Sequence, residues 1–261
     1  MGKKLLVVLT LSAALWKGAQ ASVITPEVTA MVTPTTYTLQ VSVSITNKGD
    51  EAAYNVNSII RIESIELSSK TLDNLPAEKN TTFHFSVPWK GKNPGKYFVE
   101  ILVNYTDKSQ YPFSAPSVAP FVWKEASTPQ VFCNMKNVSI EKSSRLPLTF
   151  QNLSDHPLHL HFDLFLPREL HAASYERELS LSPYETREAR IELLNQMGTD
   201  KSVYPIYTVI DYDENGHHFG TFSSSNLLIV HKTFFQRYGW AIAVLTLALT
   251  AVAVFQGTRT K

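Results

Sequence analysis

Cysteine and glycine are scarce in this 261-residue chain, which has one cysteine and ten glycines. A single thiol, Cys133, excludes an internal disulfide framework, and burial in a core is its expected fate. The sequence also lacks a glycine-rich phosphate loop, which argues against a nucleotide-binding P-loop. No serine stands in a G-x-S-x-G elbow, and Cys133 has no recognisable Cys-His context. We therefore expect no enzyme activity, no catalytic residue and no cofactor.

Charge is sparse as well, at 18% of residues with a formal net charge of +1. Seven of the 24 basic residues lie in the first 21 positions or after residue 231. The remaining 17 face all 23 acids, so residues 22–231 carry a net charge of −6. A mildly acidic body lacks the basic surface that nucleic acids require, so we expect no nucleic-acid partner.

The beginning of the chain, "MGKKLLVVLTLSAALWKGAQAS", has the anatomy of a secretory signal peptide. Lys3 and Lys4 precede an apolar run that is too short to span a bilayer comfortably, and Ala19-Gln20-Ala21 supplies an A-x-A cleavage site. Residues 1–21 are therefore predicted to be a signal peptide that directs the chain out of the cytoplasm.

A longer uncharged run lies near the other end, at residues 239–255. As a helix these 17 residues would reach about 26 Å, close to the thickness of a hydrocarbon core. Tyr238 and Trp240 provide interfacial aromatics at one edge. We predict a transmembrane helix over 239–256, a juxtamembrane segment at 232–238 and a cytoplasmic tail at 257–261. Together with the signal peptide, this predicts a single-pass type I membrane protein with an extracytoplasmic body.

The host is left open by two opposing observations. Lack of disulfides favours a bacterial envelope protein over a secreted animal one. N-x-S/T sequons would instead allow glycosylation in a eukaryotic secretory pathway. There are four of them, at Asn80, Asn104, Asn137 and Asn152.

An internal repeat divides the body. "YFVEILVNYTDKSQ" (97–110) aligns with "YPIYTVIDYDENGH" (204–217) at an offset of 107. At an offset of 105, "ITNKGDEAAYNV" aligns with "FQNLSDHPLHLH", which places Asn47 on Asn152. Landmarks in the same order predict two copies of one domain, at 22–123 and 130–231, joined by a polar linker at 124–129.

Each copy alternates apolar and polar residues with a strand period, between turns rich in Asn, Gly, Asp and Pro. Only residues 168–173 suggest a helix within the body. Strands at this spacing over about 100 residues are typical of a Greek-key sandwich. The predicted fold class is all-β: two tandem immunoglobulin-like β-sandwiches arranged as a rod, plus one C-terminal transmembrane helix.

The order of these motifs resembles a known family. A strand ending in "ITNKGD", then "LPAEKNTTFHFSV" and "NPGKYFVEILVNYTD", is similar to bacterial CARDB-type, cell-adhesion-related domains. The resemblance covers residues 26–123 well and 129–230 more loosely, because Ser154 replaces the equivalent of Gly49. It implies an immunoglobulin-like fold and an extracytoplasmic role, and it implies no activity.

The stretch "YTVIDYDENGHHFGTFSSS" (207–225) combines acids, paired histidines and serines, as a reactive site would. Asn215-Gly216, however, lies between two apolar runs and supplies the positive φ values of a tight hairpin turn. The favoured interpretation is therefore a turn flanked by exposed polar residues.

A metal site is the competing interpretation. His159 and His161 share one strand face, and Asp163 continues it. With His217 and His218 they could hold zinc or copper in an envelope compartment. The spacing lacks that of a real metal motif, so no metal ligand is assigned.

These observations predict a membrane-anchored protein–protein interaction module, such as an adhesion, scaffold or assembly subunit of an envelope complex. Its expected partners are other membrane or envelope proteins. The alternative is a periplasmic metal- or ligand-binding protein that uses the His159, His161, His217 and His218 face.

Overall fold

The computed structural model describes residues 23–90, 92–231, 238–244 and 246–248. The predicted signal peptide, most of the juxtamembrane segment and the tail at 257–261 lie outside these residues. Of the predicted transmembrane segment, residues 239–244 and 246–248 are described and are helical. No helix in this described part is long and apolar enough to cross a membrane.

The body is all-β, as predicted. Its first half contains β1 (Pro26–Pro34), β2 (Thr38–Asn47), β3 (Ala53–Ile62), β4 (Ile65–Ser68), β5 (Leu72–Leu75), β6 (Asn80–Pro88), β7 (Gly95–Thr106) and β8 (Pro112–Trp123). The second half contains β9 (Val131–Met135), β10 (Val138–Ile140), β11 (Ser143–Asn152), β12 (Leu158–Phe165), β13 (Leu170–Ala172), β14 (Glu178–Leu181), β15 (Thr186–Asn195), β16 (Val203–Glu214) and β17 (His217–Ile229).

The strands form three sheets. One has the order β1-β2-β6, and another has the order β13-β15-β11-β9. The central sheet follows β14-β12-β16-β17-β7-β3-β4, with β5, β8 and β10 paired off this path. Among the described residues it is continuous between the two halves through a single parallel pair, His218 with Gly95, where β17 meets β7.

Two separate hydrophobic cores lie between the sheets. The first draws its buried side chains from residues 39–123 and the second from residues 131–229. Along β2, alternate residues from Leu39 to Ile45 are buried, because successive strand side chains point to opposite faces. We call residues 23–123 the first lobe and residues 130–231 the second lobe.

The same buried turn occurs in both lobes. Asn47 Nδ2 donates to the carbonyl oxygens of Glu51 and Leu75, and Asn47 Oδ1 accepts from the Gly49 amide. In the second lobe, Asn152 Nδ2 donates to the carbonyl oxygens of His156, Leu181 and Ser182. Asn152 Oδ1 accepts from the Ser154 amide. Both asparagines are fully buried, so each satisfies backbone groups that its turn leaves without strand partners.

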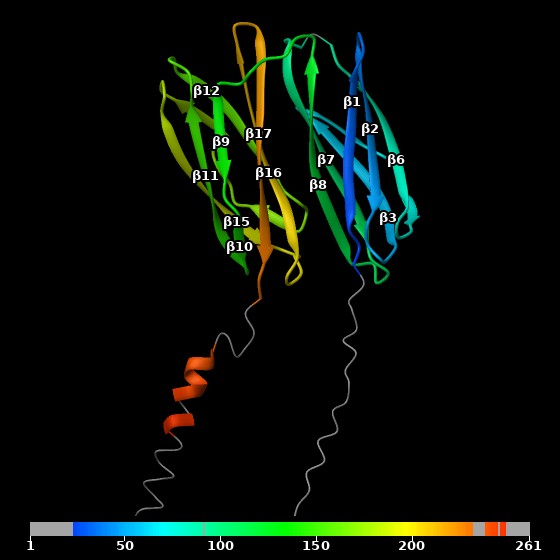
Figure 1. Ribbon diagram of the computed structural model, residues 1–261, viewed down its shortest axis with the longest axis vertical. Coiled ribbons are helices and arrows are strands. Elements are labelled where there is room, and N and C mark those ends of the chain that lie inside the picture. Colours follow the sequence, from blue (N-terminus) through cyan, green and yellow to red (C-terminus); the bar gives the residue numbers. More distant parts are fainter. Residues whose placement is uncertain (1–22, 91, 232–237, 245, 249–261) are drawn as a thin grey trace, which may run out of the picture.

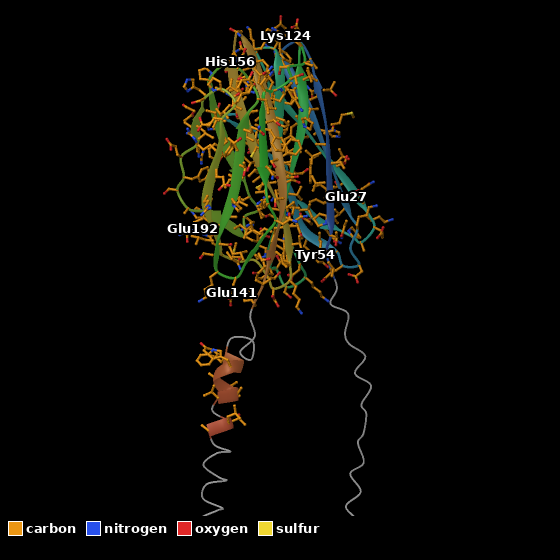
Figure 2. The ribbon with its side chains drawn as sticks, turned by 60° about the vertical axis from the view of Figure 1, so that its left-hand side comes forward. Glu27, Tyr54, Lys124, Glu141, His156 and Glu192 are labelled. Atoms are coloured by element: carbon orange, nitrogen blue, oxygen red, sulfur yellow. The ribbon has the colours of Figure 1, made fainter. Side chains whose placement is uncertain are left out.

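The lobes lie side by side (Figure 1), so the expected rod-like arrangement is wrong. β1 begins and β17 ends at one end of the body. We call this the terminal end, and Tyr54 and Glu141 lie toward it (Figure 2). Lys124, where the linker starts, lies at the opposite end, which we call the linker end. The chain therefore doubles back at the linker, and the two lobes face each other along their length.

Two smaller expectations have clear outcomes. The expected helix at 168–173 is wrong, because Leu170–Ala172 forms β13 and pairs with β15. The burial of Cys133 is confirmed: the thiol lies in the second core, and burial raises its pKa to about 12. Such a thiol stays protonated and unreactive at neutral pH.

Candidate functional site between the lobes

The two facing surfaces are the outer sides of strands whose inner sides form the cores. On β7, Tyr97 and Val99 enter the first core, whereas Phe98 and Glu100 point the other way. Phe98 meets Phe222 of β17 edge-on, with ring centroids 5.4 Å apart. Phe98 is buried yet belongs to neither core, so its burial comes from the contact between the lobes.

At the linker end the two backbones touch. The His218 amide donates to the Pro94 carbonyl oxygen at 2.8 Å, and the His218 ring stacks on Tyr97 at 3.8 Å between centroids. A Cβ at Gly95 would lie 1.9 Å from the His218 carbonyl oxygen. A Cβ at Gly220 would lie 2.5 Å from the Lys96 carbonyl oxygen. Glycine is required at both positions because the lobes approach each other there by backbone.

The linker contributes to this end through Ser127. Its hydroxyl accepts from the Lys96 amide at 3.2 Å and donates to the His218 carbonyl oxygen at 2.6 Å. The linker therefore joins the first lobe to the second by hydrogen bonds as well as by covalent connection.

A small polar cavity of about 100 Å³ lies between the lobes beside this contact. An ion pair and a histidine–carboxylate contact flank it: Arg61 lies 3.5 Å from Glu100, and His161 lies 3.5 Å from Asp211. Its lining residues are Arg61, Glu63, Tyr97, Phe98, Glu100, His161, Asp163, Val209, Asp211 and His218. Its volume exceeds that of a single water molecule, and most of its lining residues are polar.

Burial raises the pKa of two acids that line this cavity. Burial raises the pKa of Glu100 to about 7; nearby Arg61 opposes this rise, and Asp163 and Asp211 add to it. Burial also raises the pKa of Asp211, opposed by His161 and His218. The charge state of the interface therefore changes within the neutral range.

At the terminal end, one carboxylate joins the lobes. Glu169 is fully buried, and its two oxygens accept from the Ser114 amide at 2.7 Å and the Ser114 hydroxyl at 2.6 Å. Burial raises the pKa of Glu169, and these hydrogen bonds oppose the rise. The Tyr111 hydroxyl donates to the Met197 carbonyl oxygen at 2.6 Å. Side chains, rather than paired backbones, make the contact here.

Beside this contact the lobes leave an open groove of about 780 Å³. It is lined by the start of β1, by the β7–β8 turn and the start of β8, and by the segment that leads into β16. The lining residues are 23–26, Val28, Glu51, Tyr105, Asp107, 113–117, 199–205 and Tyr207. The groove therefore lies at the terminal end and takes one wall from each lobe.

The predicted hairpin in "YTVIDYDENGHHFGTFSSS" is confirmed. β16 ends at Glu214 and β17 begins at His217, and the φ values of Asn215 and Gly216 are 50° and 75°. The expectation that the flanking polar residues are exposed is wrong for His218, which is only 7% exposed. Its Nδ1 lies 3.1 Å from Asp213, and its ring packs on the first lobe.

The four histidines of the metal alternative are not gathered into one site. His159 contacts Ser180, and His217 lies 3.6 Å from Glu125. His161 and His218 both line the small cavity. Within the described part of the chain, no group of three or more His, Cys, Asp or Glu side chains could hold a metal ion.

The four sequon asparagines lie in different surroundings. Asn80 and Asn137 are exposed, and Asn137 Oδ1 accepts from the Ser225 hydroxyl and the Asn226 amide. Asn104 is half-buried and donates to Asn57. The amide nitrogen of Asn152 is buried and bonded to three carbonyl oxygens, which leaves no room for a glycan in the folded lobe.

Sequence reasoning missed the residues that join the lobes. Glu100 gives a signal, because it interrupts the apolar run "YFVEILV" in the most buried strand of the first lobe. Glu169 in "PRELHA" gives none, because an acid next to an arginine in a short predicted helix has the appearance of an ordinary solvated residue.

Comparisons with known proteins give distant likenesses in structure. No curated protein sequence matches the chain. Red sea bream transglutaminase is 14% identical over 79% of this chain and 31% of its own, with a TM-score of 0.26. Trypsin-activated alpha-2-macroglobulin from Escherichia coli is 12% identical over 80% of this chain and 18% of its own, with a TM-score of 0.32. The chain thus spans less than a third of either protein.

A protein of unknown function from Porphyromonas gingivalis W83 is 8% identical over 77% of this chain and 96% of its own, with a TM-score of 0.34. TM-scores of this size carry no argument about fold or function. The family comparison is more specific, because residues 23–109 match the profile of the CARDB family. The first lobe is therefore similar to the immunoglobulin-like CARDB family over residues 23–109.

Proposed function

We propose that this protein is a membrane-anchored, extracytoplasmic interaction module that binds a partner protein without catalysing a reaction. The observation that carries the proposal is the groove at the terminal end, which is large, open and lined by both lobes. A groove of this volume lies within the range of ligand-binding clefts, and clefts between domains are common binding sites.

Three finer inferences belong to the same proposal. The second lobe is a second copy of the CARDB-like domain, which the equivalent buried turns of Asn47 and Asn152 support. Residues 1–21 export the chain, and the apolar segment 239–256 anchors it in the membrane. The terminal end, with its groove, then faces the membrane, and a membrane protein is the partner most accessible to it.

The proposal is tested on the full-length protein, purified from native membranes in mild detergent, with quantitative mass spectrometry of the co-purifying proteins. Val203 lines the groove and is 57% exposed, so Val203→Arg places a bulky charge there without disturbing a core. Tyr184, which is 67% exposed and lies outside the groove, provides the matched control Tyr184→Arg.

We expect one or more partners to co-purify in stoichiometric amounts with the wild type and with Tyr184→Arg. The amount of partner recovered with Val203→Arg should be at least fivefold lower. Both variants should keep the wild-type melting temperature. A protein that emerges alone and monomeric from native membranes would contradict a constitutive complex.

A further inference from the structure

The floor of the groove is apolar and comes from the first lobe. Ile24, Val28 and Phe113 are partly buried side chains that pack on the first core and line the groove. Ala115 lies beside them on β8. Apolar area of this kind stabilises a bound chain only if the ligand brings apolar groups of its own.

The backbone of the groove offers acceptors more than donors. Three prolines line it, Pro26, Pro116 and Pro205, and each has a carbonyl oxygen but no amide hydrogen. On β8 the Ser114 amide points to the second lobe, where Glu169 accepts it. Pro116 lies two residues further on and directs its backbone to the same side. The open edge of β8 therefore presents carbonyl oxygens to the groove and has few free amides.

The charged side chains of the groove are also mostly hydrogen-bond acceptors. Glu51, Asp107 and Asp200 line it, and Lys201 is the one cation among the described lining residues. The lining thus carries a net charge of −2 beside an excess of carbonyl acceptors. The ligand that complements such a surface is positively charged and rich in hydrogen-bond donors.

We propose that the groove binds an extended basic segment of a partner protein, in which Arg or Lys alternates with apolar residues. This inference rests on the proposed function and names the chemistry of the partner. The apolar side chains lie on Ile24, Val28 and Phe113, and the cationic groups reach Glu51, Asp107 and Asp200 at the rim. Peptide amides of the segment donate to the carbonyl oxygens of the proline-lined walls.

Other occupants fit less well. A second copy of the body brings a net charge of −6 to an acidic groove, which opposes docking between copies. Anionic lipid headgroups meet the same repulsion. Exposed ion pairs contribute only about 0–1 kcal/mol each, so the rim carboxylates select the charge of the ligand while the apolar floor supplies affinity.

The test uses fluorescence anisotropy with the full-length protein in mild detergent. The probe is a fluorescein-labelled hexapeptide amide of alternating arginine and valine, and the control probe alternates glutamate and valine. We expect the arginine peptide to bind at least tenfold more tightly than the glutamate peptide, with an affinity that falls as salt rises.

Three variants locate the binding. Glu51→Gln combined with Asp200→Asn should weaken the arginine peptide about fivefold, since each exposed pair is worth up to about 1 kcal/mol. Asn at position 200 keeps an oxygen for the His231 amide. Val203→Arg places a bulky positive charge in the groove and should abolish binding of the arginine peptide. The exposed acid Glu188 lies outside the groove, so Glu188→Gln should change nothing.

Equal binding of the two peptides, or binding that none of the groove variants weakens, would overturn the inference. Its failure is distinguishable from failure of the proposed function. If Val203→Arg still removes the native partner while the arginine peptide does not bind, the interaction module stands and the basic segment is wrong. If Val203→Arg leaves the native partner bound and the arginine peptide does not bind, the groove is not the binding site.

Discussion

The two ends of the contact between the lobes are built in different ways. At the linker end, backbone meets backbone at Gly95 and His218, an imidazole stacks on Tyr97, and only a small polar cavity is left. At the terminal end, one buried carboxylate, Glu169, joins the lobes beside an open groove. Close backbone approach therefore leaves little space between the lobes at the linker end, whereas the side-chain contact at the terminal end leaves the groove that we propose as a binding site.

The largest expected effect is at the linker end. Gly95→Ala puts a Cβ 1.9 Å from the His218 carbonyl oxygen, so the backbones must separate. We expect a loss of about 3 kcal/mol in the free energy of unfolding and faster amide hydrogen exchange around His218. The control is Gly216→Asn in the hairpin turn, where nothing lies within 4 Å and asparagine tolerates the positive φ. Unchanged exchange at His218 in Gly95→Ala would contradict the backbone contact.

The next effect depends on pH. Because the pKa of Glu100 is about 7 in the folded protein and near 4.5 in the unfolded chain, the folded state holds an extra proton between these values. The stability that this proton provides is complete below about pH 4.5 and is lost as pH rises through 7. Glu100→Gln removes the ionisation and leaves Arg61 its contact with Glu66. The variant should be more stable than the wild type at pH 8, by up to about 3 kcal/mol, and equal to it near pH 4.

Thermal unfolding at four pH values between 4 and 8 measures this effect. Exposed Glu188, replaced by Gln, is the control, and it should follow the wild-type pH dependence. A constant difference between Glu100→Gln and the wild type across this range would rule out a raised pKa at Glu100.

At the terminal end, Glu169→Ala should lower the free energy of unfolding by about 1–3 kcal/mol, because the Ser114 amide and hydroxyl lose their buried acceptors. Glu169→Gln keeps one acceptor oxygen for the Ser114 amide, and its loss should be smaller. Urea unfolding of both variants checks the order. A cost for Gln as large as that for Ala would show that charge, rather than hydrogen bonding, matters at this position.

The smallest effect concerns the ring stack. His218→Ala removes the contact with Tyr97 and should cost about 1 kcal/mol, whereas His218→Phe keeps a ring over the tyrosine and should restore most of it. Melting temperatures of the two variants measure the difference. Equal losses would show that the hydrogen bond between His218 and Asp213, rather than the ring stack, stabilises the contact.

Local features were predictable from the sequence, and the contact between the lobes was not. Asn215-Gly216 specifies its hairpin because few residues accept two positive φ values in succession. The alternation of apolar residues along β2 and β12 identifies the core faces. The outer faces carry Glu100, His161, Asp211 and His218, and polar residues there suit water as well as a polar cavity shared with another lobe.

The turn at Asn152 illustrates the same limit. Its sequon would allow glycosylation, yet Asn152 is fully buried and its amide nitrogen is hydrogen-bonded within the turn, as that of Asn47 is in the first lobe. The expected helix at 168–173 fails because three of its residues complete a sheet edge against β15, a tertiary contact that local propensity does not contain.

Site-specific photocrosslinking in native membranes tests the central claim most directly. A benzoylphenylalanine is introduced in place of Val203, on the wall of the groove, or in place of Tyr184, outside it. The account predicts a crosslink to one partner protein from position 203, weakened when Glu51→Gln and Asp200→Asn remove two groove carboxylates, and none from position 184. Equal crosslinking from both positions, or from 184 alone, would contradict a binding site between the lobes.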